Sequence, residues 1–579
     1  MAQNTALSNE DSVGLHLRPC APQGTVTTDG NSVLASRPKA VKFICFGLAL
    51  FSLVSSLAAL LWISFAMDTS LTRDYVVEDG FFYIKTAHNF GSELMFTFDG
   101  FNPTNGFHYL YMSVLVAIDQ VVQLEGLGGV RTVILLHGAL TAVAGVLAAL
   151  LIGKLIGKDW QPAAFIAVLA VQAFYSIGTE AALLSLMAFG FLLALWYQQY
   201  NILNQSIRGL DNVGVPILTM AVCLARTEAV ILPLTCGAAY AVWHKFSRRS
   251  KESAIRTVAT TILPAFVAAS LILLLNVALT GHPITISAHL KSDFPDLLNN
   301  EWLSNKGFSY KARMIGLPLI ALIVACVLSI RLRGAEPLKA ATLLCWLGLN
   351  AYVIIFTISI YLFAISEGTL AMGGVQPYYF ELALAGTILN LIFLASEFTV
   401  WISRVRLLPS VVRTGIQWAP AIVAALILLL GGVRLQRFTT YHPSNDVVNA
   451  TTAEWLRESL SPSDRILAID HAGVIGYVSE LSVVNGDGLI NSWEYWETLR
   501  AGSLESWLQR NEVAYLYVGT GEGDPVGSLE MREGRPVVVI KLHLRGTRKY
   551  ELIAEVGQEV YRAPFQWVFP VSAIRFKVD

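Results

Sequence analysis

The stretch Val76–His108 reads VVEDGFFYIKTAHNFGSELMFTFDGFNPTNGFH and lies between apolar segments of the chain. It contains an adjacent pair of acids, Glu78 and Asp79, followed directly by aromatic residues, and it ends in a cluster of Gly, Pro and Asn over residues 102–108. Gly, Pro and Asn favour turns because of their backbone preferences. A polar stretch in this setting predicts a loop at a membrane surface.

The composition around this loop is that of a membrane protein. Of the 579 residues, 54% are hydrophobic and only 14% are charged, with a mean hydropathy of +0.55. Soluble domains carry about 25% charged residues. Several apolar runs reach the roughly 20 residues that a helix needs to cross a bilayer. The predicted fold class is therefore a polytopic α-helical membrane protein, and the net charge of −1 gives no bulk attraction to nucleic acid.

The distribution of basic residues predicts the orientation. Residues 1–40 are polar and are predicted to form a disordered cytoplasmic tail, and Lys39 and Lys42 directly precede the first apolar run. Cytoplasmic loops carry an excess of Lys and Arg, so the N-terminus is expected in the cytoplasm. The apolar runs predict about 11 spans, which places the C-terminus outside. Segment 109–123 is short for a crossing and carries Asp119, so we expect a juxtamembrane or re-entrant helix.

These expectations divide the chain into three parts: the tail 1–40, a transmembrane module 41–434 with an outer loop 67–108, and an extracytoplasmic domain 435–579. In the last part, short β-branched runs such as RILAID and VAYLYVG alternate with helical patterns such as NATTAEWLRESL. That alternation predicts a soluble α/β domain.

The acid pair in the loop has three interpretations from its residue types alone. Glu78 and Asp79 can hold a divalent metal ion, because hard cations take carboxylate oxygens. One of them can act as a general base on an acceptor hydroxyl. The pair can also be an ordinary solvated pair. The surrounding aromatic residues are typical of the interfacial belt, which does not account for the acids or for the Asn and His residues near them.

The loop resembles the first outer loop of the GT-C superfamily of polytopic membrane glycosyltransferases, which includes protein mannosyltransferases and aminoarabinose transferases. The resemblance lies in EDGFFYIKTAHN followed by FTFDGFNPTNGFHYLY. The chain departs from the pattern at Glu78, where Asp is usual, and at residues 109–111, where Pro-Leu-Trp is common. Weaker matches follow in the same order at residues 178–180 (GTE), 224–228 (LARTE), 276–291 (NVALTGHPITISAHLK) and 471–491 (HAGVIGYVSELSVVNGDGLIN).

The resemblance implies transfer of a sugar, with inversion, from a polyprenyl-phosphate carrier to an extracytoplasmic glycan, lipid or protein acceptor at the cytoplasmic membrane. Asp79 and Glu78 would be the catalytic centre, as base or as tentative metal ligands. Cations near the lipid phosphate would stabilise the leaving charge, and Lys291 and Arg226 are the candidates. The full set of candidate substrate-binding residues is Asn105, His108, Glu180, Arg226, Glu228, Lys291, Tyr378 and Tyr379.

Two other functions compete with this interpretation. A transporter or flippase of lipid-linked intermediates is expected to carry charged residues within its spans and to show related halves, and the sequence has no internal repeat. A non-catalytic membrane scaffold would tolerate loss of the acid pair. Convergence of Glu78, Asp79, Glu180 and Lys291 on one cavity would favour the enzyme over the scaffold.

Overall fold

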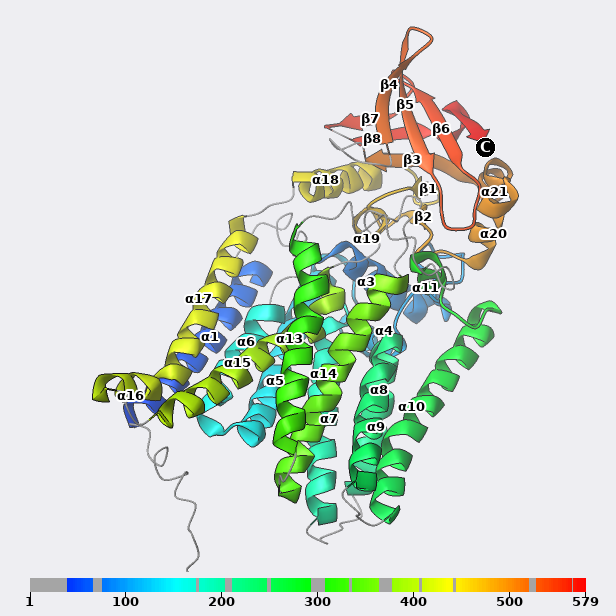
Figure 1. The fold of residues 1–579 in the computed structure, drawn as a ribbon. Helices are drawn as coiled ribbons and strands as arrows, with labels where there is room; N and C mark the ends of the chain where they lie inside the picture. Colours follow the sequence, from blue (N-terminus) through cyan, green and yellow to red (C-terminus); the bar gives the residue numbers. More distant parts are fainter. Residues whose placement is uncertain are drawn as a thin grey trace, which may run out of the picture.

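The protein is a bundle of long helices with a strand-rich C-terminal domain at one end (Figure 1). This computed structural model describes residues 39–65, 75–172, 176–203, 211–246, 251–292, 308–332, 336–363, 377–405, 409–440, 444–519, 527–564 and 566–579. The predicted fold class, a helical membrane protein with a C-terminal soluble domain, is confirmed. Nearly all of the tail predicted over residues 1–40 lies outside the described residues.

Seven helices among the described residues are long and apolar enough to cross a membrane. They are α1 (Lys39–Phe65), α5 (Gly126–Leu155), α7 (Ala181–Leu203), α10 (Lys251–Thr280), α13 (Phe308–Leu332), α14 (Pro337–Phe363) and α15 (Glu381–Ser403). Shorter helices complete the bundle: α6 (Gln161–Gln172), α8 (Asp211–Ala225), α9 (Ile231–Phe246), α16 (Ser410–Gln417) and α17 (Ala419–Thr440). The apolar runs of the sequence therefore form helices, and the number of crossings stays a prediction.

The outer surface of the bundle is apolar. Phe43, Leu274 and Leu430 are 78%, 67% and 65% exposed and lie on three different helices. Exposed apolar area costs roughly 25 cal/mol per Å² in water, and contiguous apolar surface marks a contact with another apolar phase. This surface is therefore the one that faces the lipid of a multi-pass membrane protein.

Short elements connect the bundle to the C-terminal domain. The predicted outer loop contains helix α3 (Glu78–Glu93), which is followed by α4 (Tyr109–Val122). A turn between them is fixed by Asp99, whose carboxylate accepts hydrogen bonds from the backbone N–H groups of Phe101 and Asn102 at 3.1 and 2.8 Å. Further short elements at this end are α11 (Ile286–Lys291) and the single-turn 3₁₀ helices η3 (Thr227–Val230) and η4 (Pro377–Phe380).

The C-terminal domain contains two sheets. The first has strand order β2-β1-β3-β8-β7, in which β1 pairs in parallel with β2 and β3, and β3 pairs antiparallel with β8. The second is antiparallel, with order β4-β5-β6-β9. The strands are β1 (Arg465–Ala468), β2 (Ser482–Asn485), β3 (Val513–Gly519), β4 (Gly527–Arg532), β5 (Arg535–Leu542), β6 (Tyr550–Glu555), β7 (Tyr561–Ala563), β8 (Gln566–Pro570) and β9 (Ile574–Val578). The helices are α18 (Ser444–Ser459), α19 (Ala472–Ser479), α20 (Trp493–Ala501) and α21 (Leu504–Arg510).

A continuous hydrophobic core joins this domain to the end of the bundle. Phe81 and Phe82 of α3 belong to the same buried cluster as Ile475 of α19 and Val568 of β8. Phe82 packs edge-on against Phe98, and Phe81 lies 5.5 Å from Tyr477 between ring centroids. The aromatic residues of the predicted loop therefore pack against the C-terminal domain, and the FDG turn packs with them.

Candidate active site

The acid pair opens helix α3, and the helix geometry separates its two side chains. Glu78 and Asp79 occupy the first turn of α3, where the helix dipole favours negative charge. With 3.6 residues per turn, neighbouring residues point about 100° apart around the helix axis. The carboxylate of Asp79 lines a cavity, whereas the carboxylate of Glu78 contacts helix α19.

Glu78 and Lys85 hold the two ends of α19. The carboxylate of Glu78 accepts hydrogen bonds from the backbone N–H groups of Gly473 and Val474 at the start of α19. About two turns further along α3, the buried ammonium of Lys85 donates to the carbonyl oxygens of Gly476 and Leu481 at 2.5 and 2.6 Å. Burial lowers the pKa of Lys85 to about 8. Helix α3 therefore binds the N-terminal end of α19 through the carboxylate of Glu78 and the C-terminal end of α19 through the ammonium of Lys85.

Asp79 lies between a phenol and an ammonium. The hydroxyl of Tyr378 donates a hydrogen bond to its Oδ2 atom, and Lys291 Nζ lies 3.8 Å from the same atom. Lys291 also donates to the hydroxyl of Tyr379 at 2.8 Å. Burial works to lower the pKa of Lys291, but Tyr379 and Asp79 together raise it above its ordinary value. Lys291 therefore carries a positive charge beside Asp79 at neutral pH.

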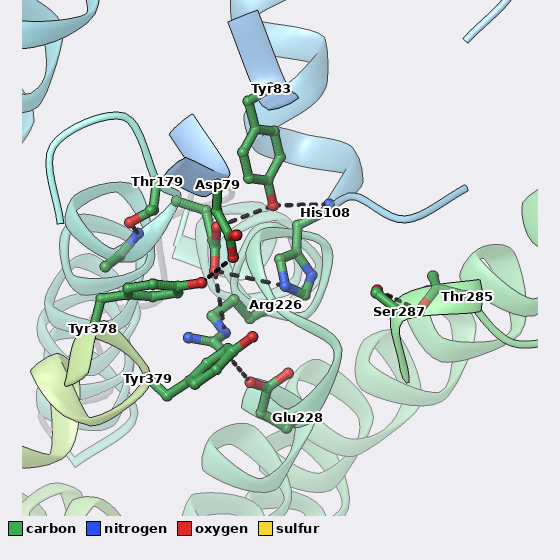
Figure 2. A network of polar contacts seen from close by, with 12 residues as sticks. Asp79, Tyr83, His108, Thr179, Arg226, Glu228, Thr285, Ser287, Tyr378 and Tyr379 are labelled. Carbon is green, nitrogen blue, oxygen red and sulfur yellow. Dashed lines mark hydrogen bonds and ion pairs between the residues drawn. The ribbon is translucent and has the colours of Figure 1, made fainter. Parts of the chain in front are cut away.

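A second polar network contains Tyr83, His108 and Arg226 (Figure 2). Glu180 contacts all three of them. Its side chain is only 3% exposed. It accepts a hydrogen bond from the Tyr83 hydroxyl at 3.0 Å, and its Oε1 atom lies 3.6 Å from His108 Nε2 and 3.5 Å from Arg226 Nε. Burial lowers the pKa of His108 below its ordinary value, against the opposing effect of Glu180. A neutral His108 leaves the Arg226 guanidinium as the cation that pairs with Glu180.

Arg226 connects this network to the aromatic ring of Tyr379. Its guanidinium is paired with Glu228 and lies 4.4 Å from the centroid of the Tyr379 ring. Lys291 Nζ lies 5.4 Å from the centroid of the same ring. Both cations therefore contact one tyrosine, which suits the attraction between cations and the π face of an aromatic ring.

Two adjacent cavities meet at these residues. Asp79, Glu180 and Tyr378 line the first, together with Leu489 and Ile490 of the C-terminal domain. The second cavity has a volume of about 270 Å³ and is lined by Arg226, Glu228 and by Phe356 and Ile360 of α14. Four residues line both cavities: His108, Ser287, Lys291 and Tyr379. The first cavity thus borders the C-terminal domain, and the second borders the membrane helices.

The structure brings together most of the residues that the sequence singled out. Eight of them line the two cavities: Asp79, His108, Glu180, Arg226, Glu228, Lys291, Tyr378 and Tyr379. Asn105 and Glu78 are not among the lining residues. The amide of Asn105 donates to Asn276 Oδ1 and to the carbonyl oxygen of Ile284, both at 3.1 Å, and its oxygen accepts from the N–H of Ile286 at 3.0 Å. Asn105 thereby positions α11, which carries Lys291.

Several lining residues were not predicted. Ser287 lies four residues before Lys291 in the motif PITISAHLK, and Tyr83 lies in the aromatic run after the acid pair. Leu489 and Ile490 belong to the GDGLIN segment, whose turn signal gave no indication of contact with the membrane module. Recognising them required knowledge of which distant segments meet.

A metal held jointly by Glu78 and Asp79 fits this arrangement poorly. The carboxylate of Glu78 is engaged by the amides of Gly473 and Val474 and is directed away from the cavity that Asp79 lines. Across the described parts of the chain, no three His, Cys, Asp or Glu side chains are grouped so that they can hold one ion. We therefore derive no step through a metal.

The long apolar helices define a multi-pass membrane protein, and solved structures of other membrane proteins share its fold. The apo oligosaccharyltransferase of Archaeoglobus fulgidus matches with a TM-score of 0.53 and 11% identity, over 81% of this chain and 69% of that chain. The oligosaccharyltransferase AglB of the same organism, in complex with an inhibitory peptide and a dolichol-phosphate, matches with a TM-score of 0.51 and 12% identity, over 81% of this chain and 69% of that chain. ArnT from Cupriavidus metallidurans, bound to undecaprenyl phosphate, matches with a TM-score of 0.50 and 13% identity, over 84% of this chain and 97% of that chain.

At this level of identity the likeness establishes the fold. Residues 437–569 also match a family described as a Domain of unknown function (DUF8728). Comparison with curated protein sequences finds no match. The particular activity of this chain must therefore be argued from its own site.

Proposed function

We propose that this protein is a membrane glycosyltransferase that moves a sugar from a polyprenyl-phosphate carrier to an acceptor hydroxyl, with Asp79 as the general base. The observation that carries the proposal is the position of Asp79. Its carboxylate lines the cavity beside the C-terminal domain and lies 3.8 Å from the ammonium of Lys291, which lines both that cavity and the one beside the membrane helices. A transferase needs this arrangement because its two substrates approach the base from different sides.

The second cavity suits the lipid-linked donor. Arg226 and Lys291 supply two cations, and Phe356 and Ile360 supply an apolar wall from a membrane helix. A phosphate that leaves as an anion is stabilised by fixed cations in a site that excludes water. The polyprenyl chain would follow α14 into the bilayer, and the phosphate would bind beside Lys291 and Arg226, which both contact Tyr379.

The first cavity suits the acceptor. An acceptor hydroxyl near Asp79 would transfer its proton to the carboxylate while its oxygen attacks the anomeric carbon. The bond between that carbon and the phosphate oxygen breaks, and the electron pair leaves with the lipid phosphate. A single displacement of this kind inverts the anomeric configuration. Tyr378 holds the carboxylate of Asp79 in place through its hydroxyl, so the base is oriented before the substrates bind.

Glu78 takes a different part in this proposal. Its carboxylate holds the N-terminus of α19 and does not line either cavity. We therefore assign Asp79 as the base and Glu78 as a positioning residue that keeps the C-terminal domain over the site. The neighbours ArnT and AglB bind undecaprenyl phosphate and a dolichol-phosphate, which agrees with a polyprenyl-phosphate carrier. We place the site at the outer face of the cytoplasmic membrane, as the basic loops predict.

The test is a transfer assay with purified full-length protein. Undecaprenyl-phosphate donors carrying mannose, arabinofuranose or aminoarabinose would be incubated with glycan, lipid and protein fractions of the source membrane, and transferred sugar would be measured by mass spectrometry. Asp79→Asn should lower the rate by about 10²–10⁴-fold, the usual contribution of a general base. Lys291→Met should weaken donor use. Glu93→Gln, an exposed acid at the far end of α3, is the matched control and should retain full activity.

Two results would overturn the proposal. The first is full transfer activity in Asp79→Asn protein. The second is binding of the lipid-linked donor followed by its movement across a vesicle membrane without transfer, which would instead indicate a flippase. A scaffold would bind neither donor nor carrier, and thermal stabilisation of the protein by undecaprenyl phosphate separates that outcome from an active enzyme that lacks its acceptor.

A further inference from the structure

A third cavity lies far from the candidate active site, near the C-terminal ends of α5 and α7 and the N-terminal end of α14. Its volume is about 460 Å³. It is lined by Gly153, Lys154, Trp196, Tyr197, Tyr200, Lys339 and Thr342. None of these residues lines the two cavities around Asp79.

Helix α7 gives the separation between the two sites. Glu180 directly precedes α7, and Tyr200 lies near its C-terminal end. A rise of 1.5 Å per residue places these two residues about 30 Å apart along the helix axis. The hydrocarbon core of a bilayer is also about 30 Å thick. The third cavity is therefore at the membrane surface opposite to the candidate active site.

Contacts between neighbouring side chains define one wall of this cavity. Trp196 is 4% exposed, and its indole N–H donates to the Thr342 hydroxyl at 2.8 Å. Its ring stacks on Tyr200 with centroids 5.5 Å apart and meets Tyr197 edge-on at 4.9 Å. Lys154 Nζ lies 4.3 Å from the Trp196 centroid. The aromatic side chains thus form one wall of the cavity, and Trp196 contacts the Lys154 ammonium.

Two lysines make the charge in this cavity positive. Lys154 comes from the last turn of α5 and Lys339 from the first turn of α14, so two different helices direct a cation to one hollow. Within the described part of the chain, no carboxylate forms an ion pair with either lysine. Interfacial lysines and aromatics are common on membrane proteins, but here two lysines from different helices and a buried, hydrogen-bonded Trp line one cavity.

We propose that this cavity binds the phosphate headgroup of an anionic phospholipid in the leaflet opposite to the candidate active site. Basic pockets between membrane helices are the sites where anionic headgroups bind. Lys154 and Lys339 would contact the phosphate, and the Trp196 and Tyr197 rings would contact the glycerol and the first part of the acyl chains. The site does not depend on the proposed transferase activity, because it shares no residue with it.

The test uses delipidated full-length protein in a neutral detergent, titrated with phosphatidylglycerol or with phosphatidylcholine and followed by native mass spectrometry. The wild-type protein should bind phosphatidylglycerol at least tenfold more tightly than phosphatidylcholine. The double variant Lys154→Ala/Lys339→Ala should lose that preference, and Lys154→Arg/Lys339→Arg should retain it. The control Lys158→Ala/Lys245→Ala removes two exposed lysines that do not line the cavity and should bind like the wild type.

Equal binding of phosphatidylglycerol by the alanine double variant and the wild type would overturn the proposal. So would equal affinity for phosphatidylcholine. Inorganic phosphate and glycerol phosphate are tested in competition, and displacement of the lipid by either one at equal concentration would show that the ligand is a soluble phosphate. Trp196→Phe keeps an aromatic wall and the charges, so retained phosphatidylglycerol preference in this variant supports the lysine assignment even where the alanine variant unfolds.

Discussion

The substitution Glu78→Gln separates the two acids of the pair. In the structure, the Glu78 carboxylate accepts hydrogen bonds from Gly473 and Val474 at the N-terminus of α19. That helix has no side-chain cap of its own, because its N-cap residue His471 makes no capping hydrogen bond. Glu78 therefore supplies, from a distant part of the sequence, the negatively charged acceptor that a helix N-terminus favours.

The magnitude follows from these contacts. Hydrogen bonds to a charged group contribute about 1.5–3 kcal/mol, and a charge at a helix terminus adds about 0.3–1 kcal/mol. Glutamine retains one acceptor oxygen and loses the charge, and Glu78 is partly exposed. The expected loss is about 1–2 kcal/mol, which corresponds to roughly a tenfold increase in the opening equilibrium of the contact between α3 and α19.

Hydrogen exchange measures this opening directly. Peptides that cover Ala472–Ser479 should exchange about tenfold faster in Glu78→Gln protein than in the wild type, with little change in the helices of the bundle. Asp79→Asn should leave the exchange of α19 unchanged, and so should the control Glu93→Gln. The reasoning fails if α19 is equally protected in Glu78→Gln protein, or if Asp79→Asn is the variant that loosens it.

Three further predictions concern Asp487, Tyr378 and His289. Burial raises the pKa of Asp487 to about 7, above its value in the unfolded chain. Ionisation of this carboxyl therefore lowers the stability of the fold as pH rises from about 4 to about 7. The loss is at most about 4 kcal/mol, and it is smaller for a side chain that keeps some exposure. Asp487→Asn should therefore raise the melting temperature above that of the wild type at pH 8 and leave it nearly unchanged at pH 4. Equal melting temperatures of variant and wild type at both pH values would refute the assignment. Tyr378→Phe removes the hydroxyl that orients Asp79 and should lower kcat about tenfold with little effect on the donor KM; a change in KM alone, in steady-state kinetics, would contradict the orienting role. Burial lowers the pKa of His289, so its protonation is disfavoured in the fold, and the stability of the contact with Trp493 should fall as pH decreases through the ordinary histidine range; thermal unfolding of His289→Phe protein should lose that dependence.

The helices and eight of the residues that line the two cavities are accessible from the sequence because both depend on local information. Apolar runs of about 20 residues mark the long helices, and the resemblance to the GT-C pattern singles out Asp79, Glu180, Arg226 and Lys291 by their own motifs. The structure then places these four residues around the two adjacent cavities.

The separate roles of Glu78 and Asp79 are not accessible in this way. In the sequence the two acids are adjacent and chemically alike. Their difference arises from a helix that begins at Glu78 and from a partner, Gly473, that lies 395 residues further along the chain. The same holds for Asn105, whose motif suggested substrate contact but whose side chain is occupied by the segment before α11. A motif shows that a residue matters locally and does not show which distant backbone it meets.

Glycine explains how two of these motifs reach one another. Gly80 follows the acid pair, and Gly178 opens the GTE turn with a φ of +95°, a conformation that L residues with a Cβ rarely adopt. A Cβ on Gly80 would lie 3.0 Å from the Cα of Gly178 and 2.6 Å from Cγ1 of Val76. A side chain at residue 80 would therefore push the start of α3 and the GTE turn apart. The N–H of Val77 also donates to the carbonyl oxygen of Ile177 at 3.1 Å. This backbone contact sets the start of α3 directly beside Glu180, and it is what allows Asp79 and the Glu180 network to line one cavity although about 100 residues separate them.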